Sequence, residues 1–162
     1  MAFGGPLRIS MPSDTEILTE RDFAAPRHLV FACYTQPPLI KRWLTGPPGW
    51  TMPVCVFEPR PGGRYRYEWH KGEERLAMSG VIHAIAVPEH ILSEEAFDQD
   101  ATGGTSKSAV DFAEKPEGTT VVNRLTYASK ALRDQIAATG MAEGMEMSFQ
   151  HLDALLAEGW GS

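Results

Sequence analysis

The chain has 162 residues, of which 43% are apolar and 22% are charged, a composition typical of one globular domain. Its formal charge is −6, and its 15 basic residues are scattered, whereas nucleic-acid binding needs a clustered basic face, so no nucleic-acid partner is expected. No apolar run approaches the length of a membrane span, and the first residues lack the apolar segment of a secretion signal. These features predict a cytoplasmic domain that does not bind membranes.

The chain divides into a short extension and one domain. Residues 1–14 contain several glycines and prolines and predict a flexible N-terminal extension, whereas residues 15–160 are expected to form a single domain. That domain begins with residues 15–24, which alternate around Ile17 and Phe23. Alternation of this kind is typical of a strand, because successive side chains point to opposite faces.

Two short helices are expected after this first strand. Pro26 opens residues 26–35 and a proline pair opens residues 37–44, and proline suits the first position of a helix. The Gly-Pro-Pro-Gly sequence at residues 46–49 ends the second helix.

The middle of the chain predicts closely spaced strands. Short turns separate them, such as Pro-Gly-Gly at residues 61–63 and Lys-Pro-Glu-Gly at residues 115–118, and residues 98–106 form a polar loop. A succession of strands joined by short turns indicates an antiparallel sheet, here of about seven strands with the first one included. The expected strands of this part span residues 50–58, 63–70, 75–87, 90–97, 107–114 and 119–128.

Residues 129–159 predict one long helix, because they lack proline and are rich in good helix formers. Gly140 and Gly144 each cost about 1 kcal/mol of helix propensity, which suggests close packing, a bend or vacant space beside them. This helix is the only element long enough to cover a curved sheet, and a gap between the two could bind a small apolar molecule. Its apolar stripe comprises Met141, Met145, Phe149, Leu152 and Leu156.

Four stretches, taken in order, resemble one family across residues 15–158: FAAPRHLVFACYTQPPLIKRWL, FEPRPGGRYRYEW with its Arg-x-Gly-Gly turn, MSGVIHAIAVPEHIL and GMAEGMEMSFQHLDALLAEG. The chain is similar to the SRPBCC superfamily, and within it to the bacterial branch related to the C-terminal domain of the activator of heat-shock-protein-90 ATPase. The resemblance implies an α+β helix-grip fold, in which a curved antiparallel sheet wraps around a long C-terminal helix.

Three aromatic residues on one strand face are the strongest site candidates. Tyr65, Tyr67 and Trp69 alternate with charged residues, so they share one face of the sheet. They could pack as core against the terminal helix or line a cavity, and their polar tips, which need partners when buried, favour a partly wet pocket. The predicted ligand-binding set is Trp43, Phe57, Tyr65, Tyr67, Trp69, Met78, Ile82, Phe97, Met141, Gly144, Met145 and Phe149.

Signals for catalysis are weaker. His83 lies within an apolar strand and Glu95 precedes Phe97, and these are the two residues that could transfer protons inside a cavity. The histidines and cysteines show no metal-ligand spacing, and phosphate-binding and dinucleotide-binding motifs are not found. The sequence therefore predicts no metal and no cofactor.

The favoured function is a cytosolic protein that holds a small hydrophobic or aromatic ligand between the sheet and the terminal helix. The first alternative is an enzyme, such as a cyclase or aromatase, that uses the same cavity. The second is a co-chaperone-like regulator of a heat-shock ATPase. By analogy with similar domains, a homodimer is an open alternative to a monomer.

Overall fold

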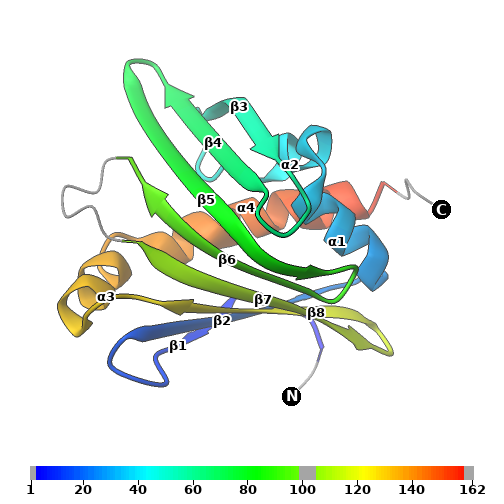
Figure 1. The fold of residues 1–162 in the computed structure, drawn as a ribbon. Helices are drawn as coiled ribbons and strands as arrows, with labels where there is room; N and C mark the ends of the chain where they lie inside the picture. The colour runs from blue at the N-terminus through cyan, green and yellow to red at the C-terminus, as the bar shows by residue number, and fades with distance from the viewer. Residues whose placement is uncertain (1–2, 99–104, 159–162) are drawn as a thin grey trace.

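The structure is a computed structural model that describes residues 3–98 and 105–158, and it shows a curved sheet around a helix (Figure 1). Within those residues, no helix combines the length and the apolarity needed to cross a membrane. The strands are β1 (Arg8–Ser10), β2 (Glu16–Phe23), β3 (Thr51–Phe57), β4 (Arg64–Lys71), β5 (Glu74–Ala86), β6 (His90–Phe97), β7 (Ser106–Lys115) and β8 (Gly118–Thr126). The helices are α1 (Arg27–Thr35), α2 (Pro37–Trp43), α3 (Lys130–Ala137) and α4 (Met141–Leu156).

All eight strands form one antiparallel sheet in the order β1-β2-β8-β7-β6-β5-β4-β3. Strands β3 to β8 pair in sequence, and β2 pairs with β8 along its whole length. The predicted α+β helix-grip fold is confirmed, with one strand more than expected. The additional strand, β1, lies inside the segment that was predicted to be a flexible extension.

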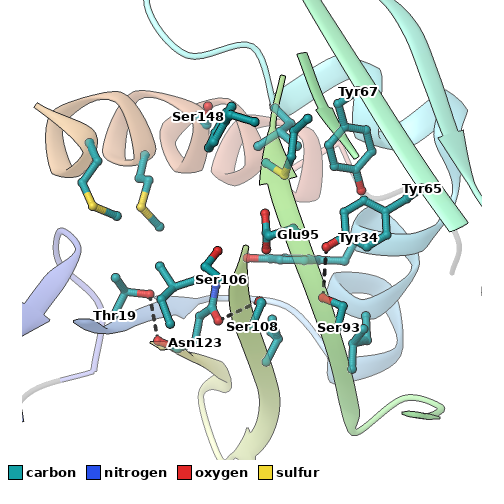
Figure 2. A pocket seen from close by; sticks show the side chains of 18 of the residues that line it. Thr19, Tyr34, Tyr65, Tyr67, Ser93, Glu95, Ser106, Ser108, Asn123 and Ser148 are labelled. Carbon is teal, nitrogen blue, oxygen red and sulfur yellow. Dashed lines mark hydrogen bonds between the residues drawn. The ribbon is translucent and has the colours of Figure 1, made fainter. Parts of the chain in front are cut away.

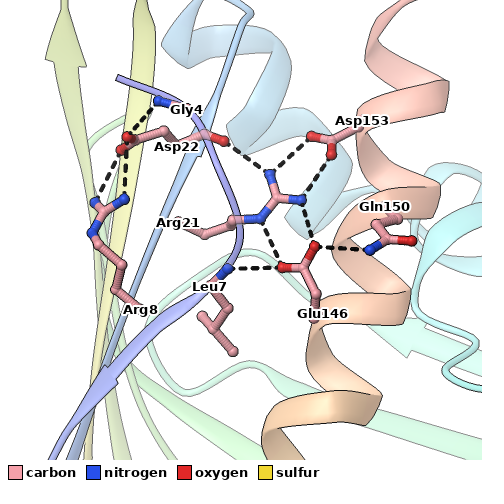
Figure 3. Close-up of polar contacts among 8 residues, drawn as sticks. All are labelled: Gly4, Leu7, Arg8, Arg21, Asp22, Glu146, Gln150 and Asp153. Carbon is pink, nitrogen blue, oxygen red and sulfur yellow. Dashed lines mark hydrogen bonds and ion pairs between the residues drawn. The ribbon is translucent and has the colours of Figure 1, made fainter. Parts of the chain in front are cut away.

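Polar contacts hold β1 on the sheet. The Asp22 carboxylate of β2 accepts from the Arg8 guanidinium, with Nη2 at 3.2 Å from Oδ1, and from the backbone N–H of Gly4 at 2.9 Å (Figure 3). The Thr120 hydroxyl of β8 donates to the same carboxylate at 2.7 Å. These hydrogen bonds lower the pKa of Asp22 against the opposing effect of its burial. Glycines and prolines near the chain start were therefore a poor guide to its structure.

The predicted pair of short helices lies between β2 and β3. Pro26 precedes α1 with an extended backbone, and Pro37 opens α2, as expected for prolines at helix starts. The Trp43 indole Nε1 at the end of α2 donates to the backbone carbonyl of Cys33 in α1 at 2.8 Å. This buried hydrogen bond fixes the angle between the two helices.

The predicted single terminal helix is instead two helices. Gly140 adopts a left-handed backbone with φ of +79° at the start of α4, so the helical path is interrupted between α3 and α4. Helix α4 lies along the concave side of the sheet, and α3 lies near one end of it (Figure 1). The predicted stop at Gly159 falls outside the described residues, and α4 ends at Leu156.

The C-terminal half of α4 is packed firmly. Phe149, Leu152 and Leu155 are buried in the main hydrophobic cluster with Phe23 and Phe112, and the Phe23 and Phe149 rings meet edge to face at 5.5 Å. A second cluster lies under α2. It comprises Ile40, Met52, Tyr65, Tyr67, Trp69 and Ile82.

An ion-pair cluster around a buried arginine also joins the sheet to α4. Arg21, on the inner face of β2, contacts the carboxylate of Glu146, with Nε 3.0 Å from Oε1, and that of Asp153, with Nη2 2.8 Å from Oδ2 (Figure 3). The guanidinium also lies over the Phe23 and Phe149 rings, at 5.1 and 5.8 Å from their centroids. Burial alone would lower the pKa of Arg21, but the two carboxylates raise it overall. We refer to Arg21, Glu146 and Asp153 as the clamp.

Candidate functional site

A pocket of about 370 Å³ lies between the inner face of the sheet and α4 (Figure 2). Pockets that bind small molecules usually measure about 300–1,000 Å³, so this one would suit a small ligand. The sheet supplies most of its wall. Residues of α3 and the N-terminal half of α4 cover it, and Trp43 and Leu44 at the end of α2 also line it.

Most of the residues predicted for a cavity line this pocket. They come from the sheet, from α4 and, in the case of Trp43, from the end of α2. Whether they contact a ligand stays a prediction. The residues are Trp43, Phe57, Tyr65, Tyr67, Met78, Phe97, Met141, Met145 and Phe149.

Three predicted residues do not line the pocket. Trp69 is buried against the end of α2, where its indole Nε1 donates to the backbone carbonyl of Leu44 at 2.7 Å. Ile82 is fully buried in the cluster under α2. Gly144 lies in α4, where an added Cβ would meet open space. Alternation placed Trp69 on the correct face, but it could not show how far along the strand the pocket extends.

Phe57, Tyr65 and Tyr67 form a continuous aromatic wall, with ring centroids 5.6 and 5.4 Å apart. Gly80 of β5 lies opposite Tyr65, and a Cβ at Gly80 would stand 2.0 Å from the Tyr65 Cζ. Only glycine therefore lets the Tyr65 ring lie across β5. This position brings the Tyr65 hydroxyl within 3.0 Å of the Ser93 hydroxyl on β6.

A band of polar side chains crosses the sheet beneath the pocket, and the sequence reasoning missed it. Thr19 lies opposite Asn123, and Ser93 lies opposite Ser108. The Ser108 hydroxyl donates to the Asn123 Oδ1 at 3.1 Å. Each of these residues occupies an inward position of its strand, and Asn123 lies between the apolar inward neighbours Val121 and Leu125. A polar residue in such a position is the signal that could have revealed the band.

Glu95 places a carboxyl group in the pocket (Figure 2). It follows Ser93 by two residues on β6, so both side chains are on the inner face. Burial raises the pKa of Glu95 to about 7, and hydrogen bonding to Tyr65 and Ser108 opposes that rise. Glu95 is only partly buried, because its side chain keeps accessible surface where it faces the pocket. Near neutral pH, this carboxyl group can therefore occupy both protonation states.

The other proton-transfer candidate, His83, lies outside the pocket. Its side chain is 50% exposed, and its Nε2 lies 3.5 Å from Oε1 of Glu94, which is also partly exposed. Among the residues that the structure describes, His, Cys, Asp and Glu side chains form no group of three that could hold a metal ion. The chemistry available in the pocket thus rests on Glu95 and its neighbouring hydroxyls.

Comparisons with known proteins identify the family. The family described as "Activator of Hsp90 ATPase homolog 1-like protein" matches residues 24–157. The chain belongs to this family. A protein from Rhodobacter sphaeroides of known structure is 32% identical over 95% of this chain and 99% of its own, with a TM-score of 0.90. One from Mycobacterium smegmatis is 26% identical over 93% of this chain and 97% of its own, with a TM-score of 0.82. No curated protein matches the chain in sequence.

Membership of this Hsp90-activator-homolog family confirms the resemblance to the SRPBCC superfamily. A protein from Nitrosomonas europaea, 19% identical with a TM-score of 0.80, covers 91% of this chain and 97% of its own and shows the same fold. A fold of this kind hosts unrelated functions, so function must be argued from the pocket itself.

Proposed function

We propose that this protein binds a small, mainly apolar or aromatic molecule in the pocket between the sheet and α4. The observation that carries the proposal is the aromatic wall of Phe57, Tyr65 and Tyr67, which faces a hollow instead of a packed helix. Apolar surface gains free energy when water is replaced by an apolar partner, at about 25 cal/mol per Å². A ligand that fills the hollow would gain this free energy from both walls.

The opposite wall suits a ligand of adaptable shape. Met141 and Met145 on α4 are partly buried and line the pocket. Methionine side chains are flexible and polarizable, so they can adjust to different aromatic rings. The hydroxyls of Tyr34 and Tyr67 point into the same space (Figure 2), where they could orient one polar group of the ligand.

The proposal is tested by filling the pocket from α4. We expect 1-naphthol, used as a probe, to bind the wild-type protein in isothermal titration calorimetry. Met145→Trp should weaken binding at least about tenfold, because the indole would occupy the space of the probe. Met147→Trp is the matched control, since Met147 lies two residues away on α4 and is exposed. Equal binding by all three proteins, or none by the wild type, would contradict the proposal, provided that thermal unfolding shows all three folded.

A catalytic use of the same pocket is the second candidate, and Glu95 is the observation that favours it. A carboxyl group whose pKa is raised to about 7 can donate or accept a proton at neutral pH. If the protein is an enzyme, Glu95→Gln should abolish turnover of a bound molecule while retaining its binding. Mass spectrometry of the ligand after incubation with each protein would separate the two outcomes.

A co-chaperone-like role stays a prediction that rests on the family alone. It is tested by measuring the ATPase rate of a bacterial heat-shock-protein-90 with and without this protein. An unchanged rate at saturating protein concentration would remove this alternative. The cytoplasmic location likewise stays a prediction.

A further inference from the structure

Two residues that line the pocket carry a formal charge when ionised, tyrosines aside: Arg21 and Glu95. All five N–H donors of Arg21 are already used. Nε and Nη2 donate to Glu146 at 3.0 and 3.1 Å, Nη1 and Nη2 donate to Asp153 at 3.0 and 2.8 Å, and Nη1 also donates to the backbone carbonyl of Asp22 at 3.0 Å. Arg21 therefore has no donor left for an anionic ligand.

Glu95 is in the opposite situation. Over the part of the chain that the structure describes, none of the ion pairs involves Glu95. The Tyr65 hydroxyl can donate to Glu95 while it accepts from Ser93 at 3.0 Å. The Ser108 hydroxyl also hydrogen-bonds to Glu95. A carboxylate offers about four acceptor positions, so these two partners leave about half of its capacity unused.

The polar band adds further hydrogen-bond acceptors near Glu95. Ser93 lies two residues before Glu95 on β6, Ser108 lies opposite Ser93 on β7, and the amide oxygen of Asn123 on β8 accepts from Ser108. Hydroxyls can accept as well as donate. The polar side of the pocket thus combines an ionisable acceptor with neutral groups, while its cation is fully engaged. A ligand carboxylate placed there would face Glu95 without a compensating charge, which is costly in a buried site.

We propose that the pocket selects molecules whose apolar body carries a hydrogen-bond donor, above all a protonated amine, directed at Glu95, and that it discriminates against carboxylates. This inference rests on the proposed binding function, because it assigns the chemical class of the ligand in the same pocket. A charge-assisted hydrogen bond is about twice as strong as a neutral one, so an amine should exceed an alcohol of the same shape.

The test compares four naphthalenes that share one ring body: 1-(aminomethyl)naphthalene, 1-naphthalenemethanol, 1-naphthoate and unsubstituted naphthalene. Titrations at pH 8 keep Glu95 ionised, while the facing hydroxyls of Tyr65, Tyr67 and Tyr127 stay neutral because burial raises their pKa. We expect the amine to bind roughly tenfold more tightly than naphthalene and the carboxylate at least roughly tenfold more weakly.

Two variants separate the local carboxylate from the overall negative charge of the chain. Glu95→Gln should remove the preference for the amine and improve binding of 1-naphthoate. Glu94→Gln makes the same change of charge one residue away, on a side chain that pairs with exposed His83, and should leave the preference unchanged. An amine preference that survives in Glu95→Gln, or disappears in Glu94→Gln, would overturn the inference.

Naphthalene distinguishes the failure of this inference from the failure of the proposed function. If naphthalene binds and the three substituted probes bind equally, the inference is wrong and the binding function stands. If none of the four probes binds the wild type, the proposed binding function itself is wrong.

Discussion

The two halves of α4 contact the sheet in opposite ways. The C-terminal half, from Phe149 to Leu155, buries its apolar side chains and is joined to β2 through Asp153, whereas the other carboxylate of the clamp, Glu146, lies in the N-terminal half. The N-terminal half, with Met141 and Met145, faces the pocket. The difference shows how one helix can both complete a core and leave a hollow: apolar packing holds the C-terminal half, and the ion pair of Glu146 with Arg21 holds the N-terminal half without filling the space beside it.

The interactions between α4 and the sheet also differ between the two halves of the helix. Leu152 has no exposed surface, and burying a leucine contributes about 1.5–3 kcal/mol. The clamp adds a guanidinium held by two carboxylates between helix and sheet. Under the other half, the polar band and Glu95 keep the sheet surface unsuited to a packed apolar helix, so the hollow is consistent with the side chains on both walls.

The largest effect is expected from breaking the clamp. Arg21→Met keeps the length of the side chain but leaves Glu146, which is 20% exposed, beside an apolar group. We expect a loss of about 3 kcal/mol in the free energy of unfolding, the lower end for breaking a buried ion pair, because Arg21 is buried whereas Glu146 and Asp153 keep exposed surface. Urea unfolding measures it. Arg66→Met is the control, since Arg66 pairs with Asp98 at the surface and should cost less than about 1 kcal/mol. Equal losses would contradict the role given to the clamp.

The pocket should make the stability of the protein depend on pH, through Glu95. Because the folded protein raises the pKa of Glu95 from 4.5 to about 7, folding favours its protonated form. The contribution of Glu95 to the free energy of unfolding is fully present below about pH 4.5 and is lost as the pH rises through about 7. We expect the free energy of unfolding of Glu95→Gln to exceed that of the wild type by about 2 kcal/mol at pH 8 and to equal it at pH 4.5. The difference at pH 8 is kept this small because Glu95 retains some contact with solvent. Urea unfolding at both pH values, with Glu94→Gln as the control, measures it; a difference that does not change with pH would contradict the assignment.

The smallest effect concerns two glycines of similar sequence context. Gly144→Ala should stabilise the protein by about 0.5–1 kcal/mol, because an added Cβ meets open space in the interior of α4. Gly140→Ala should destabilise it by about 1 kcal/mol, because φ of +79° is unfavourable for alanine. Thermal unfolding of both variants compares them. The same sign of change in both would mean that the break between α3 and α4 is not where the structure places it.

Local patterns sufficed for much of the fold. Alternation along residues 64–71 identified the face that carries Tyr65 and Tyr67, and the turn residues identified the hairpins. Positions of proline predicted the starts of α1 and α2. These features depend on residues that are close in the chain, so they can be predicted from a single sequence.

Features that depend on distant partners could not be predicted. Arg21 occupies an inward position on β2, but the carboxylates that make this position acceptable lie 125 and 132 residues away on α4. Gly140 could have been tolerated within a helix, and only the course of the chain shows that it ends one. Tyr34 lines the pocket from α1, and it was not among the residues predicted for the site.

One measurement tests the binding of a small apolar molecule beneath α4 most directly. The methyl groups of methionines, labelled with ¹³C, are followed in NMR spectra during titration with 1-naphthol, because some methionines line the pocket and others are exposed. We predict that the signals of Met78, Met141 and Met145 shift together and saturate, while those of exposed Met11 and Met147 do not move. Shifts confined to Met11 or Met147, or no shift at a saturating concentration of the probe, would contradict it.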